Sequence, residues 1–294
     1  MKRLALISTL AACLAAPVAL QADNGTIHNR GSDTLFPIAQ AWATAYQSKH
    51  PETAIDVRGC GSDSGFLALI NKTAHLASSS RAIKKKELTE AEKNGVSPRE
   101  HLVGYDALSI LVNKANPVSW ISVPSLAEVY GEKGTLDDWN KLGVAVPGCP
   151  KNKITVVGRQ VGSGTHLFFQ ETVLGKQREF KHDDSVMDVH DSNDVPNIVA
   201  QNPCAIGYVG MAYEAPDVKK LKISKDRNTA VIDATMTTAI DGTYPIARPL
   251  FMYTNGEPEG RLKAYLDWIK SDEGQCMLIE KGYAPVRHVA CGGR

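Results

Sequence analysis

The sequence predicts an α/β protein made of two lobes, each a mixed, mostly parallel sheet flanked by helices, with two crossover strands joining them. Strands and helices alternate along most of the 294 residues, a length that suits one large or two medium domains. Small-residue turns separate several strands from the helices that follow them, as in parallel sheets covered on both faces. Two longer apolar strands, at residues 102–113 and 245–254, lie far apart in the chain.

The first third of the chain contains three predicted strand–helix pairs. The strands are at residues 26–29, 54–58 and 75–77, and the helices at residues 36–50, 66–71 and 84–94. In the first helix, Ile38, Trp42, Ala45 and Tyr46 share one stripe, which is typical of a helix with one buried face. Gly95 ends the third, charged helix, because glycine readily adopts the backbone conformation that follows a helix.

The middle of the chain repeats the alternation, and the end is helical. Predicted elements are a helix at 125–130, a strand at 154–158, helices at 165–174 and 195–201, a strand at 205–209, and helices at 257–270 and 272–280. If the two long strands cross between lobes, residues 23–105 and 246–294 form the first lobe and residues 106–245 the second. One large sheet is the alternative that periodicity leaves open.

The charge balance argues against a nucleic-acid partner. Lys and Arg number 33 against 32 Asp and Glu, a net charge of +1, whereas nucleic-acid binding needs a concentrated basic face. The longest basic run, Lys84-Lys85-Lys86, is typical of a solvated helix face.

The N-terminus has the pattern of a cleaved secretory signal, assigned to residues 1–22. Lys2 and Arg3 precede an apolar stretch, and a small-residue region ends at Ala22. A lipoprotein signal with a lipid on Cys13 is the alternative, but the residues after Cys13 stay apolar where a tether is usually polar. No later stretch approaches the roughly 18 apolar residues of a membrane span. We therefore expect a soluble, periplasmic mature chain.

Cysteines outside the signal are odd in number, so at least one thiol stays unpaired. Export permits disulfides, and no pair has the C-x-x-C spacing of a zinc or redox site. The pairings to test are Cys149 with Cys204 and Cys276 with Cys291, because each pair falls within one predicted lobe. Cys60 is the remaining cysteine.

Three turns combine a strand end, small residues with hydroxyls, and the start of a helix. They lie at residues 31–34, 59–65 and 162–165, and Arg159 precedes the third. Unpaired N–H groups and the dipole make a helix N-terminus favourable for an anion. Glycine allows close approach, and Ser or Thr adds a hydroxyl donor. The pattern indicates an oxyanion site, with three ordinary capped helices as the alternative.

Enzyme motifs do not fit the spacing. Val161 stands where a G-x-S-x-G elbow around Ser163 requires glycine, and the loop at Gly59 lacks the lysine of a nucleotide P-loop. The histidines show no metal-ligand spacing, and we expect the acidic and histidine-containing segment 182–191 to be a solvated loop rather than a metal site. We therefore predict no catalytic residue, no metal and no cofactor.

Taken in order, these motifs resemble the periplasmic phosphate-binding proteins of high-affinity phosphate ABC transporters. The segments that match are Gly31-Ser32-Asp33-Thr34-Leu35, Gly61-Ser62, Ser79-Ser80-Arg81, Arg159-x-x-Gly162-Ser163-Gly164-Thr165 and Ala205-Ile206-Gly207-Tyr208-Val209. The resemblance covers essentially the whole mature chain. It implies the two-lobed binding-protein fold, capture of inorganic phosphate by lobe closure, and delivery to permease subunits of the inner membrane, with the binding protein acting as a monomer.

The resemblance also implies the ligand contacts. They come from Thr34 and Leu35 in the first loop, Ser62 in the second, and Arg159, Ser163, Gly164 and Thr165 in the third, with the loop from Arg159 to Thr165 as the chief grip.

One position departs from the best-known pattern, because the chain reads Ser79-Ser80-Arg81 where many members have a Ser-Asp step. A buried carboxylate there accepts the phosphate proton and repels sulfate, which carries none. The variant resembles another branch of the family, in which Asp106 could supply the carboxylate, while Arg81 adds a second cation or pairs with Asp106. Ser80 is included among the contacts. The rival functions are binding of sulfate, molybdate or a phosphonate, and an exported phosphatase on the same scaffold.

Overall fold

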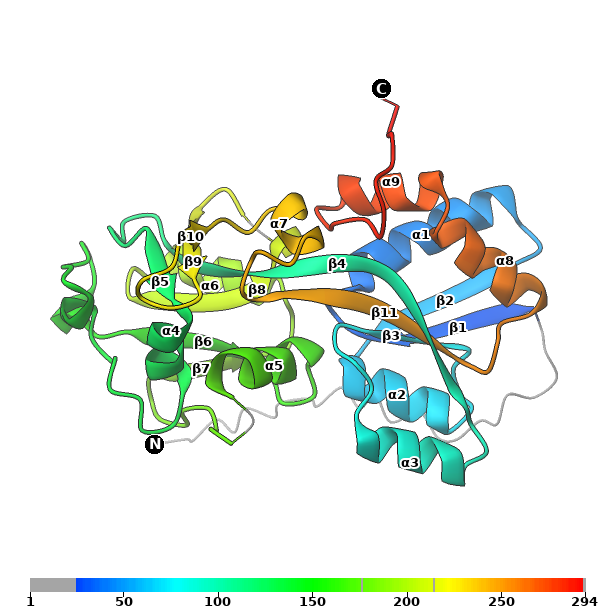
Figure 1. The fold of residues 1–294 in the computed structure, drawn as a ribbon, viewed down its shortest axis with the longest axis horizontal. Coiled ribbons are helices and arrows are strands. Elements are labelled where there is room, and N and C mark those ends of the chain that lie inside the picture. The colour runs from blue at the N-terminus through cyan, green and yellow to red at the C-terminus, as the bar shows by residue number, and fades with distance from the viewer. Residues whose placement is uncertain (1–24, 176, 214, 293–294) are drawn as a thin grey trace, which may run out of the picture.

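The computed structural model describes residues 25–175, 177–213 and 215–292. The expected signal peptide and Cys13 lie outside these residues. Two strands far apart in the sequence, β4 (Pro98–Asn113) and β11 (Ala247–Asn255), run side by side between two lobes (Figure 1). They correspond to the two long strands that the sequence predicts.

The first lobe is one sheet with strand order β2-β1-β3-β11-β4. The parallel strands are β1 (Thr26–Gly31), β2 (Ala54–Gly59) and β3 (Leu76–Ser79), and β11 joins them antiparallel. One face packs on α1 (Phe36–Lys49), α8 (Gly260–Ile269) and α9 (Asp272–Glu280). The other packs on α2 (Ser62–Ile70) and α3 (Lys85–Lys93). Buried Ile38, Trp42 and Tyr46 lie on the predicted stripe of α1.

The second lobe continues from the far half of β4. Its sheet has the order β4-β8-β6-β7, with β8 (Ala205–Gly210), β6 (Thr155–Arg159) and β7 (Val186–Val189). A side branch contains β5 (Trp120–Ser122), β9 (Val218–Ser224) and β10 (Val231–Ile232). One face packs on α4 (Val123–Tyr130), α5 (Gly164–Phe169) and α7 (Met236–Ile240), and the other on α6 (Asp194–Gln201).

Strand β4 changes partner where it passes between the lobes. Ala107 pairs with Ala247 of β11, and the next residue, Leu108, pairs with Gly210 of β8. Just before this point Asp106 lies opposite Arg248 in the β4–β11 register. The crossover therefore brings a buried acid and a buried base together between the lobes. The exact lobe boundaries, at 105/106 and 245/246, stay a prediction.

The segment around residues 182–191 differs from the prediction. Within it, β7 pairs in parallel with β6, so part of the expected loop is an edge strand. Its Met187 and Asp188 are exposed, so the four-residue strand shows neither the continuous apolar run of a strand covered on both faces nor the alternation of one covered on a single face. In the described part of the chain, no group of three His, Cys, Asp or Glu side chains is placed to hold a metal ion.

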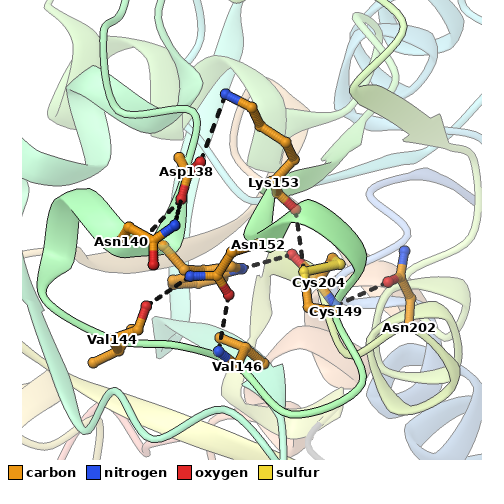
Figure 2. The surroundings of a disulfide bond; sticks show 10 residues. Asp138, Asn140, Val144, Val146, Cys149, Asn152, Lys153, Asn202 and Cys204 are labelled. Atoms are coloured by element: carbon orange, nitrogen blue, oxygen red, sulfur yellow. Dashed lines mark hydrogen bonds and ion pairs between the residues drawn. A yellow bond between two sulfur atoms is a disulfide. The ribbon is translucent and has the colours of Figure 1, made fainter.

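The disulfide between Cys149 and Cys204 is confirmed, with the two Cα atoms 4.9 Å apart. Figure 2 shows how polar side chains hold the chain on both sides of it. Asn202 accepts the Cys204 N–H at 2.9 Å, and Asn152 donates to the Val144 carbonyl at 2.7 Å. The bridge spans 55 residues of the second lobe, and native disulfides typically stabilise a fold by about 2–4 kcal/mol.

The second predicted disulfide, Cys276 with Cys291, is also confirmed, and it ties the end of the described chain to α9. Cys60 takes part in neither disulfide. No helix of the described residues has both the length and the apolar character that crossing a bilayer requires.

Candidate functional site

The three loops singled out in the sequence meet between the lobes. Thr34 lies just before α1, Ser62 is the first residue of α2, and Gly164 is the first residue of α5. The hydroxyls of Thr34 and Thr165, one from each lobe, are 2.9 Å apart and buried. The first N–H groups of a helix have no partner within it, so three helices direct donors and the positive ends of their dipoles toward one region.

Serine hydroxyls of the first lobe gather beside these helix starts. Ser32 donates to Ser80 at 3.1 Å, and the Ser80 backbone N–H donates to Ser62 at 3.2 Å. All three side chains are buried. Ser62 and Ser80 pack against Gly164 of the second lobe, where an added Cβ would lie 2.5 Å from the Ser80 hydroxyl and closer still to that of Ser62. Only glycine allows this approach between the lobes.

Arg248 on β11 lies beside the hydroxyls of Thr34 and Thr165 and the backbone carbonyl of Ser80. Its Nε and Nη2 donate to the Asp106 carboxylate at 3.1 and 2.8 Å, and neither side chain has any exposed surface. Nη2 also donates to Thr165 at 3.0 Å and to Thr34 at 3.3 Å, while Nη1 donates to the Ser80 carbonyl at 3.2 Å. This guanidinium therefore contacts hydroxyls from both lobes.

Arg248 was not predicted as a site residue, because in the sequence it lies within a stretch that indicates only a long apolar strand. The signal was an arginine inside a strand predicted to be buried, since a buried charge requires a partner. Burial raises the pKa of Asp106, and the charge of Arg248 and the Met211 N–H oppose that rise.

Arg159 is also fully buried, but its guanidinium is bound by protein groups. Nη1 donates to Ser192 at 2.6 Å, Nη2 to the His190 carbonyl at 2.7 Å, and Nε to the Val189 carbonyl at 3.4 Å. Nη2 also lies 3.4 Å from the carboxylate of Asp33. Burial lowers the pKa of Arg159, and Asp33 opposes that effect. The donors of Arg159 thus reach acceptors of the protein, whereas Nη2 of Arg248 reaches the hydroxyls of Thr34 and Thr165. The expected contact of Arg159 with the ligand stays a prediction.

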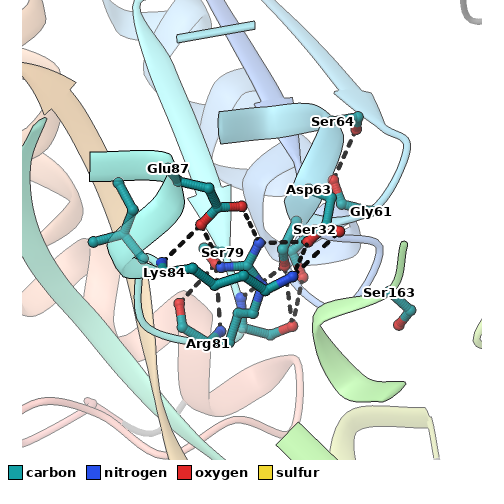
Figure 3. Close-up of polar contacts among 12 residues, drawn as sticks. Ser32, Gly61, Asp63, Ser64, Ser79, Arg81, Lys84, Glu87 and Ser163 are labelled. Atoms are coloured by element: carbon teal, nitrogen blue, oxygen red, sulfur yellow. Dashed lines mark hydrogen bonds and ion pairs between the residues drawn. The ribbon is translucent and has the colours of Figure 1, made fainter. Parts of the chain in front are cut away.

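Arg81 follows Ser79 and Ser80 at the end of β3, and its side chain lies beside the acidic side chains of Asp63 and Glu87 (Figure 3). Its guanidinium binds Asp63 and Glu87, with Nη1 2.9 Å from Glu87, and it stacks 4.7 Å from the centre of the Phe66 ring. Burial disfavours the charged form of Arg81, yet its hydrogen bonds to Glu87 and Asp63 outweigh burial and raise its pKa. The expected alternative that Arg81 pairs with Asp106 is wrong, because Arg248 holds that carboxylate.

Some of the predicted residues surround Arg248, and the others lie elsewhere. Arg248 contacts Thr34, Ser80, Asp106 and Thr165, and Ser62 and Gly164 lie against Ser80. Leu35 is buried at the start of α1. Ser163 accepts the Thr165 N–H at 3.2 Å and so caps its own helix, while Arg159 and Arg81 bind other protein groups.

Comparison with known proteins places the chain among solute-binding proteins. A family model described as a PBP superfamily domain matches residues 16–273. The phosphate-binding protein PstS of Pseudomonas aeruginosa is 31% identical over 274 residues, which cover 90% of this chain and 84% of that protein. The chain belongs to the family of PstS phosphate-binding proteins within this superfamily. The resemblance noted in the sequence is thus confirmed.

Other members of the family agree in sequence and in fold. Protein SphX of Synechococcus elongatus is 29% identical and covers 87% of this chain and 76% of its own length. A solved protein of Clostridium perfringens, described as a phosphate ABC transporter substrate-binding protein with bound phosphate, is 25% identical with a TM-score of 0.77, covering 89% of this chain and 100% of its own. An ABC-type phosphate transport receptor from Vibrio cholerae is 26% identical with a TM-score of 0.71, covering 88% and 99%. The predicted two-lobed fold is confirmed.

Proposed function

We propose that the mature chain binds inorganic phosphate between its lobes in the periplasm and delivers it, as a monomer, to the permease of an ABC transporter. The observation that carries the proposal is the Arg248 guanidinium, held by Asp106 and directed at the hydroxyls of Thr34 and Thr165. Membership of the PstS family supports phosphate as the ligand. The expected export signal supports the location.

In this proposal phosphate is held by one charge and several neutral donors. Arg248 supplies a charge-assisted hydrogen bond, which is roughly twice as strong as a neutral one. Hydroxyls of Thr34, Ser62 and Thr165 and the first N–H groups of α1, α2 and α5 supply the rest. Because these groups come from both lobes, they converge only when the lobes close, and closure excludes water.

Asp106 gives the site its preference among oxyanions. Phosphate keeps a proton at neutral pH and can donate it to a carboxylate, whereas sulfate has none to donate. The Asp106 carboxylate therefore accepts a hydrogen bond from phosphate, and its negative charge repels sulfate. Its pairing with Arg248 favours the ionised form that this role requires.

A phosphatase is less well supported than a binding protein. Nucleophilic catalysis needs a hydroxyl activated by an adjacent base. Ser163 accepts an N–H from its own helix, and His166 Nδ1 lies 2.7 Å from the Arg159 carbonyl rather than beside a serine. We therefore propose no enzymatic activity.

Titration calorimetry of the mature protein with phosphate, sulfate and molybdate tests the proposal. We expect phosphate to bind most tightly and sulfate weakly. Asp106→Asn should weaken phosphate binding by about 10- to 100-fold, because a hydrogen bond to a charged group contributes about 1.5–3 kcal/mol. The ratio of the phosphate affinity to the sulfate affinity should also become smaller. Thermal unfolding of the variant checks that it folds with Arg248 unpaired. Tighter binding of sulfate or molybdate by the wild type, or hydrolysis of a phosphomonoester that requires Ser62, would overturn the proposal.

A further inference from the structure

Asp33 lies where the three loops of the site meet, although the proposed ligand grip does not use it. It belongs to the loop between β1 and α1 in the first lobe. Its carboxylate accepts the N–H of Gly61, which belongs to the second loop. The same carboxylate lies 3.4 Å from Nη2 of Arg159, at the end of β6 in the second lobe. One side chain thus connects all three loops.

The arginine side of this contact belongs wholly to the second lobe. Ser192 and the carbonyls of Val189 and His190 fix the Arg159 guanidinium from the same lobe. These neutral acceptors orient the charge but do not compensate it. Asp33, whose side chain is 20% exposed against 0% for Arg159, is the carboxylate in ion-pair contact with it.

A second contact joins Asp33 to the other lobe. The hydroxyl of Tyr213, in the turn after β8, donates to the Asp33 backbone carbonyl at 2.5 Å. Burial raises the pKa of Asp33 and the charge of Asp191 adds to this rise, while Arg159 and the Gly61 N–H lower it. The carboxylate therefore depends on Arg159 to offset its desolvation.

We propose that the Asp33–Arg159 ion pair is a latch between the lobes that forms on closure and slows release of the ligand. The inference rests on the proposed function, because the ligand whose dissociation rate the pair lowers is taken to be phosphate. Opening the lobes separates Asp33 from Arg159, so the pair must break before phosphate leaves. Asp33 acts through Arg159 and through the Gly61 loop, and is a positioning residue rather than a ligand contact. Most effects of such contacts fall on the dissociation rate.

Stopped-flow measurement of phosphate binding and release tests the latch with full-length mature protein. Asp33→Asn keeps an oxygen that accepts the Gly61 N–H but removes the charge. We expect its dissociation rate to rise about tenfold, within the range measured for coupled contacts, with the association rate changed less than about twofold. Arg159→Gln should behave similarly, and the double variant should release phosphate no faster than the worse single variant.

Asp56→Asn is the matched control, because Asp56 pairs with Arg30 at 2.6 Å inside the first lobe. It should leave the dissociation rate unchanged. Tyr213→Phe removes the second contact between Asp33 and the other lobe, together with the hydrogen bonds of the same hydroxyl with Ser192 and Tyr283. It keeps the Asp33–Arg159 ion pair, and should raise the rate by a smaller factor even if Asp33→Asn folds poorly. Wild-type release from both Asp33→Asn and Tyr213→Phe, fully additive effects in the double variant, or an equal rise in the control would overturn the latch. Failure of the wild type to bind phosphate in the same assay would instead overturn the proposed function.

Discussion

Two arginine–aspartate pairs lie between the lobes; both arginines are buried, and the pairs differ in what surrounds the arginine. Arg248 and Asp106 face each other on neighbouring crossover strands. Nη2 of Arg248 also reaches hydroxyls from both lobes, and Nη1 donates to the Ser80 carbonyl. Arg159 and Asp33 come from different lobes, and the other donors of Arg159 bind acceptors of its own lobe. The first arrangement leaves a cation facing a group of donors, which suits holding an anion. The second joins one part of the protein to another.

An arginine in a recognisable motif thus need not be the one whose donors reach hydroxyls of both lobes. Arg159 lies in the most specific motif of the sequence, yet its guanidinium donates to Ser192 and to two backbone carbonyls of its own lobe. Arg248 lies in no motif, yet it contacts the hydroxyls of Thr34 and Thr165. The function of each guanidinium follows from the acceptors around it, since all of its donors are fixed in one plane.

Gly164→Ala should have a large effect on the Arg248 region. The new Cβ would meet the hydroxyls of Ser62 and Ser80, which belong to the opposite lobe, so it should hinder closure. Overpacking of this kind costs about 1–3 kcal/mol, so phosphate affinity should fall by about 10- to 100-fold while the unliganded protein keeps its melting temperature.

The control for this variant is Gly162→Ala in the same loop, where an added Cβ meets nothing within 4 Å. It should bind phosphate nearly as the wild type does. Equal affinities for the two variants would show that close packing of Gly164 on the serines is not needed for binding.

His166, which lies beside Arg159, should make the free energy of unfolding modestly dependent on pH. Its Nδ1 lies 2.7 Å from the Arg159 carbonyl, and burial lowers its pKa below the ordinary 6.5. The unfolded chain therefore takes up a proton first as the pH falls below about 6.5, and stability falls until the folded histidine is protonated too. One such group changes the free energy of unfolding by at most about 1.4 kcal/mol per pH unit.

Thermal unfolding at pH 7.5 and 5.5 measures this contribution. His75 and His101, whose pKa values burial also lowers, act in the same direction, whereas the raised pKa values of Asp33 and Asp106 act in the opposite one. The difference between wild type and His166→Gln isolates one group, and the variant should lose less stability on acidification. An identical loss in both proteins would mean that His166 is not held neutral.

Much of the fold could be predicted, because its main elements have strong local signals. The stripe of α1, the charged face of α3 and the apolar runs of β4 and β11 each depend on residues close in sequence. The short strands β5, β7, β9 and β10 were missed. Strand β9 contains Lys219, Lys220 and Lys222, and such a sequence reads as a solvated surface until the sheet that pairs with it is known.

The helix starts of the candidate site could be predicted from local patterns. A strand, a small-residue turn and a helix pointed to Thr34, Ser62 and Thr165, whereas Ser80 and Asp106 were predicted from the family resemblance. The Asp106–Arg248 pair depends on a strand register between residues 142 positions apart, which no local pattern reveals. The partners of Arg81 depend in the same way on how α2 and α3 pack.

The most direct test titrates phosphate into Arg248→Gln and Arg159→Gln side by side by calorimetry, with Arg248→Lys as the variant that keeps the charge. We predict that Arg248→Gln loses about 100-fold or more in affinity, because a charged hydrogen-bond partner is removed from a buried site. Arg248→Lys should recover part of that loss, and Arg159→Gln should bind only about tenfold more weakly, through faster release. Wild-type affinity in a folded Arg248→Gln protein, with binding abolished in Arg159→Gln, would contradict the assignment of Arg248 as the cation that holds the anion.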